Sequence, residues 1–390
     1  MAEKKKQHYI PQFYMRFFAD SNKEFSVCNV NNQAIYPHIP YRDQCYKNYF
    51  YGEDKVLENQ FSVLEGQWKE TIQKANNFCP LDPIDCDVLK QFMVYQRQRT
   101  LGDNLFTQQS EIQMNIECIK TIYAYHGVPF EGPTKGSCLK AVTEQSTELG
   151  SLNFVTECLK SILDLDVLVI HYDTHRKLIS SDVPIVAINP FHQCSIGYGC
   201  MGFILLAPIS PHNLLLAYDG KMYPRYVGKQ YISLHNESEV FHLNVLQMIS
   251  AHKIIFGREI NELQEFKKEN WEERQNSRDI APVGTLGPEP NKMIYMSPRK
   301  VIHNHIFSFG QMKQDFNMIP FVCREAAPRV YDVGWENKFR QKIQIMPKLM
   351  GLLYKDSDNS DVRYTTKQIY NGCKAMLKAA QKYWQTDLNN

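Results

Sequence analysis

The sequence predicts an α+β fold, in which an N-terminal helical cluster packs with a small antiparallel sheet and a basic, mainly helical C-terminal region follows. Apolar residues recur at helical spacing up to about residue 165, short β-rich runs occupy about 166–235, and helical spacing returns at about 239–257. Because helices and strands are grouped rather than alternating, a doubly wound βαβ architecture is excluded. We see no internal repeat.

The helical cluster is expected at about 54–165. Leu57, Phe61, Leu64, Trp68 and Ile72 form one apolar stripe, which predicts a helix beginning near Val56. Prolines then interrupt the pattern. Further helices are predicted by the apolar spacing after residue 88, at Asn104–His126 and at Leu152–Ile162.

The sheet is expected from four β-rich runs, and an earlier hairpin from a turn-like Asn31-Asn32 pair. The hairpin would join Glu24–Val30 to Gln33–Tyr36. The four runs of the sheet are Asp166–His171, Pro184–Asn189, Phe203–Pro208 and Leu214–Tyr218. Residues 239–256 then follow as a helix, because Val240, Leu243 and Leu246 lie on one side of it.

The chain of 390 residues divides into a core, 1–274, a linker or long loop, 275–291, and a basic helical region, 292–390. The linker is rich in Pro, Gly and Asn. From Lys292 on, 16 Lys and Arg against 8 Asp and Glu give +8, and the other 28 basic and 34 acidic residues give −6. Two helices are expected here, Lys338–Tyr354 and Thr365–Gln385. The region could bind an anionic partner such as nucleic acid, or dock on the acidic core.

Composition favours a cytoplasmic protein. No run approaches the ~18 apolar residues of a membrane span, and the N-terminus lacks the apolar stretch of a signal peptide. The 11 cysteines include no CxxC pair, which favours free thiols in a reducing compartment. The motifs of dinucleotide-binding folds, P-loop ATPases, α/β-hydrolases, zincins and kinases are also missing, so no nucleotide cofactor is expected.

Six separated blocks carry a resemblance to a known family. They are KKQHYIPQFYMRFF, ENQFSVLE, the QRQRT run at Gln96–Thr100, SSDVPIVAIN, PISPHNLLLAYD and LNVLQMISAHKIIFG. In this order they resemble the bacterial family catalogued as domain of unknown function 4238, over about residues 4–257. The resemblance implies no established activity. Its association with mobile elements and defence genes is the only setting that it suggests.

His8 and two glutamates are the first candidate site residues. His8 lies beside Pro11 in an aromatic run, where it could be a general base, a metal ligand or a packed core histidine. Glu58 and Glu65 are two helical turns apart and therefore share a face. They could hold a divalent metal such as Mg²⁺ or Mn²⁺, or they could be ordinary solvated positions.

The Q-x-x-R run supplies the next candidates. Gln96 continues the apolar row of its helix and Arg99 follows it, so an amide and a guanidinium are expected on a buried face. A carboxylate of the protein, from Glu58, Glu65 or Asp182, would make Arg99 structural. A phosphate or carboxylate of a substrate would make it functional.

Ser181 and Asp182 precede Val183-Pro184 between two β-rich runs. Asp182 could orient a histidine, bind a metal or accept hydrogen bonds from nearby backbone amides. The spacing His171-x-Asp173-x-His175 matches a metal motif, but it falls where a hairpin tip is expected, and polar residues are common there.

Our leading hypothesis is a metal-assisted phosphodiester hydrolase, a nuclease. His8, Gln96, Arg99 and Asp182 would be catalytic, and Glu58 and Glu65, with help from Asp182, would hold the metal. The substrate contacts would come from Lys6, Gln7, Arg97 and Ser181. The alternative is a non-catalytic sensor or binding module for a protein partner or an anionic ligand, in which these polar residues form a structural network.

Overall fold

The computed structural model describes residues 6–53, 56–125, 127, 152, 155–189, 198–199, 202–278, 283–286, 293–296, 305 and 307–310. The chain divides into two compact units. The first comprises residues 1–105, 151–280 and 298–329, and the second comprises 106–150, 281–297 and 330–390. The two long predicted C-terminal helices lie outside the described residues.

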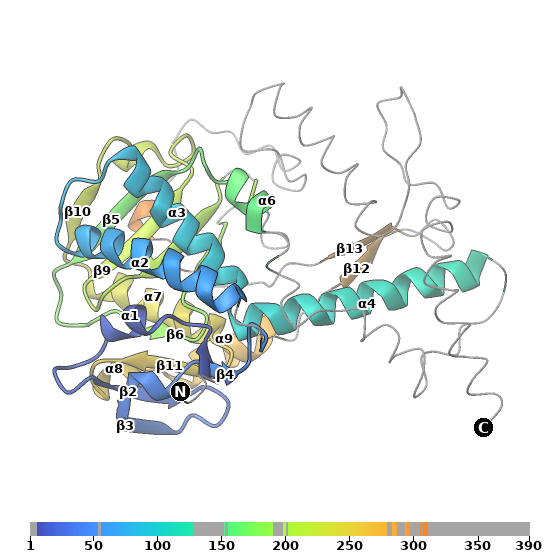
Figure 1. Cartoon of the computed structure of the whole chain (residues 1–390), viewed down its shortest axis with the longest axis horizontal. Helices are drawn as coiled ribbons and strands as arrows, with labels where there is room; N and C mark the ends of the chain where they lie inside the picture. The colour runs from blue at the N-terminus through green and yellow to red at the C-terminus, as the bar shows by residue number, and fades with distance from the viewer. Residues whose placement is uncertain are drawn as a thin grey trace. The chain divides into compact units, whose positions relative to one another are not determined.

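Three long helices follow one another in the first third of the chain (Figure 1). Helix α2 spans Val56–Asn76, α3 spans Pro83–Gln98 and α4 spans Leu101–Tyr125. Asp82 starts α3 with a capping box, in which its side chain and that of Asp85 each accept the other residue's backbone N–H. The predicted helices at Val56 and at 104–126 are therefore confirmed. Of the predicted helix at Leu152–Ile162, the described residues Val155–Lys160 form α6.

The main sheet has five strands in the order β10-β5-β9-β8-β7. The strand bounds are Tyr231–Leu234 for β10, Asp166–Tyr172 for β5, Asn213–Tyr218 for β9, Ile204–Pro208 for β8 and Val186–Ile188 for β7. All four predicted runs are strands of this sheet. The expectation of a purely antiparallel sheet is wrong at one edge, because β10 pairs with β5 in parallel.

A second sheet, which the sequence did not predict, has the order β3-β2-β11-β6. The hairpin of β2, Glu24–Asn29, and β3, Ile35–Pro40, is as expected. Strand β11, Ile254–Gly257, lies between β2 and β6, Ser180–Ser181, and is antiparallel to both. The helix predicted to reach residue 257 instead ends at Ser250, as α7, Glu237–Ser250. A small pair, β1 at Lys6–His8 and β4 at Tyr46–Asn48, completes the strands formed by the described residues of this unit.

Helix α7 contributes to the cores of both sheets. Val240, Leu243 and Leu246 belong to the cluster built on the five-stranded sheet. Val245 and Met248 belong instead to a second cluster, which includes residues of β2 and β11. A helix with apolar residues on more than one face is expected where more than one face is covered. Helix α7 therefore packs against both sheets and contributes to two separate hydrophobic clusters.

Residues beyond the predicted core also belong to the first unit. Helices α8, Asn261–Gln264, and α9, Lys268–Arg278, follow β11, so part of the predicted linker is helical. Phe307 lies just before the 3-10 turn Ser308–Gly310, and Phe309 lies within it. Both are buried in the hydrophobic cluster of the five-stranded sheet. Glu239 of α7 accepts hydrogen bonds from the Ser308 backbone N–H and hydroxyl.

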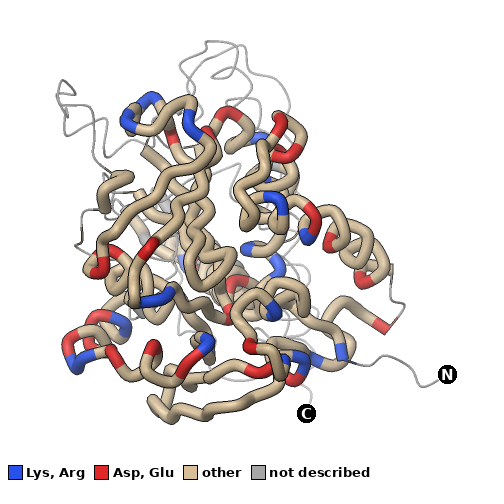
Figure 2. Tube along the Cα trace, turned by 90° about the vertical axis from the view of Figure 1, so that its left-hand side faces the viewer, with Lys and Arg blue, Asp and Glu red and all other residues tan. Residues whose placement is uncertain are grey.

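The remaining described elements are short. Helix α1 spans Gln12–Arg16, and single 3-10 turns lie at Tyr41–Asp43 and Pro224–Tyr226. In the second unit, β12, Val283–Leu286, pairs with β13, Met293–Met296, as a hairpin. Charged residues of both signs are scattered along the described trace (Figure 2). Among the described helices, none combines the length and apolar character that a bilayer crossing requires.

Candidate functional site

The N-terminal strand β1 fixes two of the predicted residues. Gln7 is fully buried, donates from Nε2 to the Gly52 carbonyl across 3.0 Å and accepts the Tyr51 N–H on Oε1 across 2.6 Å. His8 is half-buried, and its Nε2 lies 2.9 Å from the Arg42 carbonyl oxygen. A carbonyl only accepts, so Nε2 carries the proton and Nδ1 keeps its lone pair. Gln12 approaches that Nδ1 at 3.4 Å.

Arg99 lies at the C-terminal end of α3 with no exposed surface. Its Nε donates to Gln96 Oε1 across 2.9 Å, and its Nη1 donates to Glu65 Oε1 across 2.8 Å. The guanidinium also lies over the rings of Phe61 and Trp68, 4.7 and 5.4 Å from the centroids. Gln96 in turn donates from Nε2 to the Tyr9 carbonyl. The predicted buried amide and guanidinium are confirmed, and Glu65 of α2 is the carboxylate partner.

Tyr51 contacts the His8 carbonyl and lies near the Arg99 guanidinium. The sequence analysis did not single out this residue. Its hydroxyl donates to the His8 carbonyl across 3.2 Å. Burial raises the pKa of Tyr51 to about 12, against the opposing charge of the nearby Arg99 guanidinium. Burial also lowers the pKa of His8, although its hydrogen bond to the Arg42 carbonyl and the negative charges of Glu65 and Glu58 act in the other direction. His8 is therefore neutral at pH 7.

Two polar atoms of this group lack a hydrogen-bond partner among the described residues. They are Nη2 of Arg99 and Oε2 of Glu58, and both atoms are buried. A buried polar atom without a partner costs about 1–3 kcal/mol or more when the group is charged. Such atoms in a folded protein call for an explanation, and a bound water, ion or ligand is one. We call His8, Tyr51, Glu58, Glu65 and Arg99 the arginine cluster.

Ser181 and Asp182 have other partners. The two carboxylate oxygens of Asp182 accept the backbone N–H groups of His252 and Lys253, each across 2.7 Å. The Ser181 hydroxyl donates to Gln247 Oε1 of α7 across 2.9 Å. Asp182 therefore holds the turn between α7 and β11, which is the backbone-binding role that the sequence left open. Its negative charge nonetheless contributes to raising the pKa of Tyr9, for which burial is the main cause.

Two of the predicted substrate-binding residues, Lys6 and Arg97, have aspartates as partners. Lys6 is exposed, pairs with Asp43 across 3.1 Å and lies over the ring of Tyr46. Arg97 is directed toward Asp103, 3.7 Å away, and toward the ring of Tyr198. No contact between Arg97 and the arginine cluster is seen among the described residues, whereas the positive charge of Lys6 contributes to lowering the pKa of His8.

The predicted H-x-D-x-H group does not converge. His171 bonds through Nδ1 to Asn213 Oδ1 across 2.8 Å, whereas Asp173 pairs with the exposed His235. The backbone N–H of His175 donates to Glu237. The side chains of His171 and Asp173 thus have different partners, and the contact given by His175 is made by its backbone.

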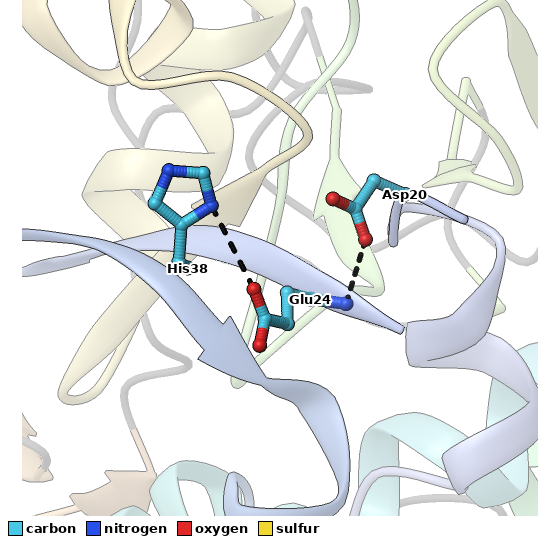
Figure 3. A group of neighbouring side chains, drawn as sticks. All are labelled: Asp20, Glu24 and His38. Carbon is cyan, nitrogen blue, oxygen red and sulfur yellow. Dashed lines mark hydrogen bonds and ion pairs between the residues drawn. The ribbon is translucent and has the colours of Figure 1, made fainter. Parts of the chain in front are cut away.

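A different trio brings its ligand atoms together. Asp20, Glu24 and His38 each place one such atom within 4.8 Å of the other two, and of the described residues only this group does so (Figure 3). Glu24 Oε2 lies 3.7 Å from His38 Nδ1, and Asp20 accepts the Glu24 backbone N–H. His38 is largely exposed, so an ordinary surface ion pair accounts for the arrangement. No sequence signal predicted it, because the hairpin of β2 and β3 creates it.

Comparison with known proteins gives one match. The model of a protein family of unknown function, DUF4238, matches residues 6–260. The chain belongs to this family. The match confirms the resemblance carried by the six sequence blocks, and it contains every residue of the arginine cluster as well as Asp182. No curated protein and no solved structure matches the chain of this DUF4238 member.

The fold brings several of the family-like blocks together. Gln96 bonds to the Tyr9 carbonyl, and Tyr14 bonds through its hydroxyl to the Pro208 carbonyl and Ser180 Oγ. Gly102, at the start of α4, has room for no side chain, because a Cβ there would lie 2.9 Å from Val183 and from His252. The N-terminal segment, the end of α3 and the Ser181-Asp182 turn are thus neighbours in the first unit.

Proposed function

We propose that this DUF4238 protein is a metal-assisted phosphodiester hydrolase whose site is the arginine cluster. The observation that carries the proposal is the pair of buried, unpartnered atoms, a carboxylate oxygen of Glu58 and a guanidinium nitrogen of Arg99. A divalent cation would satisfy the first atom and a phosphate oxygen the second. A cation and a phosphate bound together are what metal-assisted phosphodiester hydrolysis requires.

The roles follow from the contacts. Glu58 and the partly exposed Glu65 would hold the ion, which supplies Lewis-acid charge at the scissile phosphate. Nη2 of Arg99 would donate to a non-bridging oxygen. His8 would accept through Nδ1 the proton of the water that attacks phosphorus, while the bond from phosphorus to the leaving oxygen breaks. Asp182 is left out of this set, because both of its oxygens already bind backbone amides.

The second candidate is a non-catalytic binding module. It is favoured by the ion pair of Arg99 with Glu65 and by the buried hydrogen bonds of Gln7, Gln96 and Ser181, which are typical of a structural network. In that case Arg99 Nη2 would bind the carboxylate or phosphate of a ligand without turnover.

Cleavage of plasmid DNA, single-stranded DNA and total RNA, with Mg²⁺ or Mn²⁺, tests the proposal. The key variant is Glu58→Gln, which keeps the size of the side chain and removes its charge. Glu70→Gln, an exposed position on the same helix, is the matched control. We expect metal-dependent cleavage that falls about 100-fold or more in Glu58→Gln and is unchanged in Glu70→Gln. Absence of cleavage by the wild type, or full activity of a folded Glu58→Gln variant, would overturn it.

A further inference from the structure

A cavity of about 350 Å³ lies away from the arginine cluster, between the loop after β5 and the segment around α8. Its charged lining combines four glutamates with two cationic side chains: Glu237, Glu259, Glu262, Glu265, Arg176 and Lys177. With all four glutamates ionised, the lining has a net charge of −2. A cavity of this size accommodates a small molecule.

The cationic side chains of the lining are already engaged. Arg176 donates from Nε to Glu265 Oε2 across 2.6 Å and from Nη1 to the Glu237 carbonyl across 2.7 Å. Lys177 donates from Nζ to the Thr174 carbonyl. Glu237 accepts the backbone N–H groups of His175 and Arg176 on its two oxygens. Arg176 thus pairs with Glu265, and the single charge of Lys177 offsets only one of the other three glutamates, so a net charge of −2 remains when all are ionised.

Glu262 is the buried carboxyl of this cavity, with 6% of its surface exposed. Its Oε2 accepts the Glu259 backbone N–H across 3.2 Å, and it forms no ion pair with any described residue. The carboxyl packs against the backbone of β11, because a Cβ on Gly257 would lie 2.4 Å from Oε2. Burial raises the pKa of Glu262 to about 7, and the neighbouring Glu259 charge adds to this, whereas the backbone N–H bonds and Arg258 oppose it.

We propose that this cavity binds a small organic cation, a primary ammonium or a guanidinium, with Glu262 and Glu259 as its counter-charges. A buried carboxylate without a cation is costly, so a ligand that supplies one is favoured there. A metal ion fits less well. Three ligand atoms within 4.8 Å of one another occur among the described residues only at Asp20, Glu24 and His38. The separated carboxylates of the cavity suit an extended cation with several donors.

Titration calorimetry on the full chain tests this, with 1,4-diaminobutane as the ammonium probe, L-arginine as the guanidinium probe and Mg²⁺ as a control. The variants are Glu262→Gln and, as the matched control, Glu269→Gln, an exposed glutamate on α9. We expect one of the organic probes to bind the wild type, with affinity lowered about tenfold or more in Glu262→Gln and unchanged in Glu269→Gln.

The pH dependence provides an independent readout. Cation binding requires ionised Glu262, so the affinity at about pH 6 should be roughly tenfold below that at about pH 8, and the effect should vanish in Glu262→Gln. Three results would each overturn the proposal. They are binding of neither organic probe at millimolar concentration, equal binding by Glu262→Gln, and binding of Mg²⁺ in place of both organic probes.

Discussion

Arg99 Nη1 lies 2.8 Å from Glu65 Oε1 and so ties the end of α3 to the middle of α2. The guanidinium is fully buried, whereas 28% of the Glu65 side chain is exposed. The pair therefore lies with its cation inside and its anion at the surface. A buried guanidinium is tolerated only where it is paired, which makes this contact a condition for packing the two helices.

Replacing Arg99 by Ala should lower the free energy of unfolding by about 3–5 kcal/mol, because Glu65 and Gln96 lose a buried partner and a cavity remains. Urea unfolding measures it. Arg97→Ala serves as the comparison, since the Arg97 side chain is 18% exposed, its ion pair with Asp103 is long at 3.7 Å and its contact with the Tyr198 ring is at 6.0 Å, so it should cost clearly less. Equal costs for the two variants would contradict the role assigned to the Arg99 pair.

Replacing Asp182 by Ala should destabilise the protein by about 3 kcal/mol, since two backbone N–H groups lose charged acceptors at 2.7 Å. Asp182→Asn keeps one oxygen acceptor and should cost less. The exposed Asp173 is a matched control, and Asp173→Ala should change the unfolding free energy by less than about 1 kcal/mol. If folded Asp182→Asn lost all cleavage activity at full stability, Asp182 would belong to the catalytic set after all.

Glu262 should make stability depend on pH. The pKa of its carboxyl is raised from 4.5 to about 7 in the folded chain, so the stabilising contribution of its protonated form is complete below the unfolded pKa. It is lost as the pH rises through about 7, by about 3 kcal/mol in total. Glu262→Gln should therefore gain stability relative to the wild type toward pH 8. Thermal unfolding of both proteins from pH 4.5 to 8 measures this difference, and parallel curves would contradict it.

The stretch around Ser308 should be part of the cooperative core. Phe307 and Phe309 stack at 5.0 Å between ring centroids and are 5% and 4% exposed. Phe309→Ala should therefore cost about 3–5 kcal/mol in unfolding free energy. Tyr36→Ala, at a 47% exposed aromatic position, should cost much less. A negligible effect of Phe309→Ala would separate this stretch from the core.

Much of the candidate site could be predicted from the sequence. The helical row of α3 placed Gln96 and Arg99 on a buried face, and the two-turn spacing placed Glu58 and Glu65 on one side of α2. The sequence left three carboxylates open as the partner of Arg99, because the residue spacing of one helix says nothing about the helix that packs against it. Tyr51 was missed, since its role depends on the loop that Gln7 anchors.

Local patterns in the sequence determined the long helices, four of the five strands of the main sheet and the hairpin of β2 and β3, because side-chain periodicity is a property of each segment alone. Only the tertiary structure decided that residues 254–257 form a strand, because Ile255 pairs with Cys28 and Ser181, far away in the chain. The tertiary structure also decided that α7 ends at Ser250 and that its apolar residues pack into the clusters of two different sheets. Strand pairing and helix burial depend on partners remote in sequence, and these partners also bring Arg99, Glu65 and His8 into one cluster.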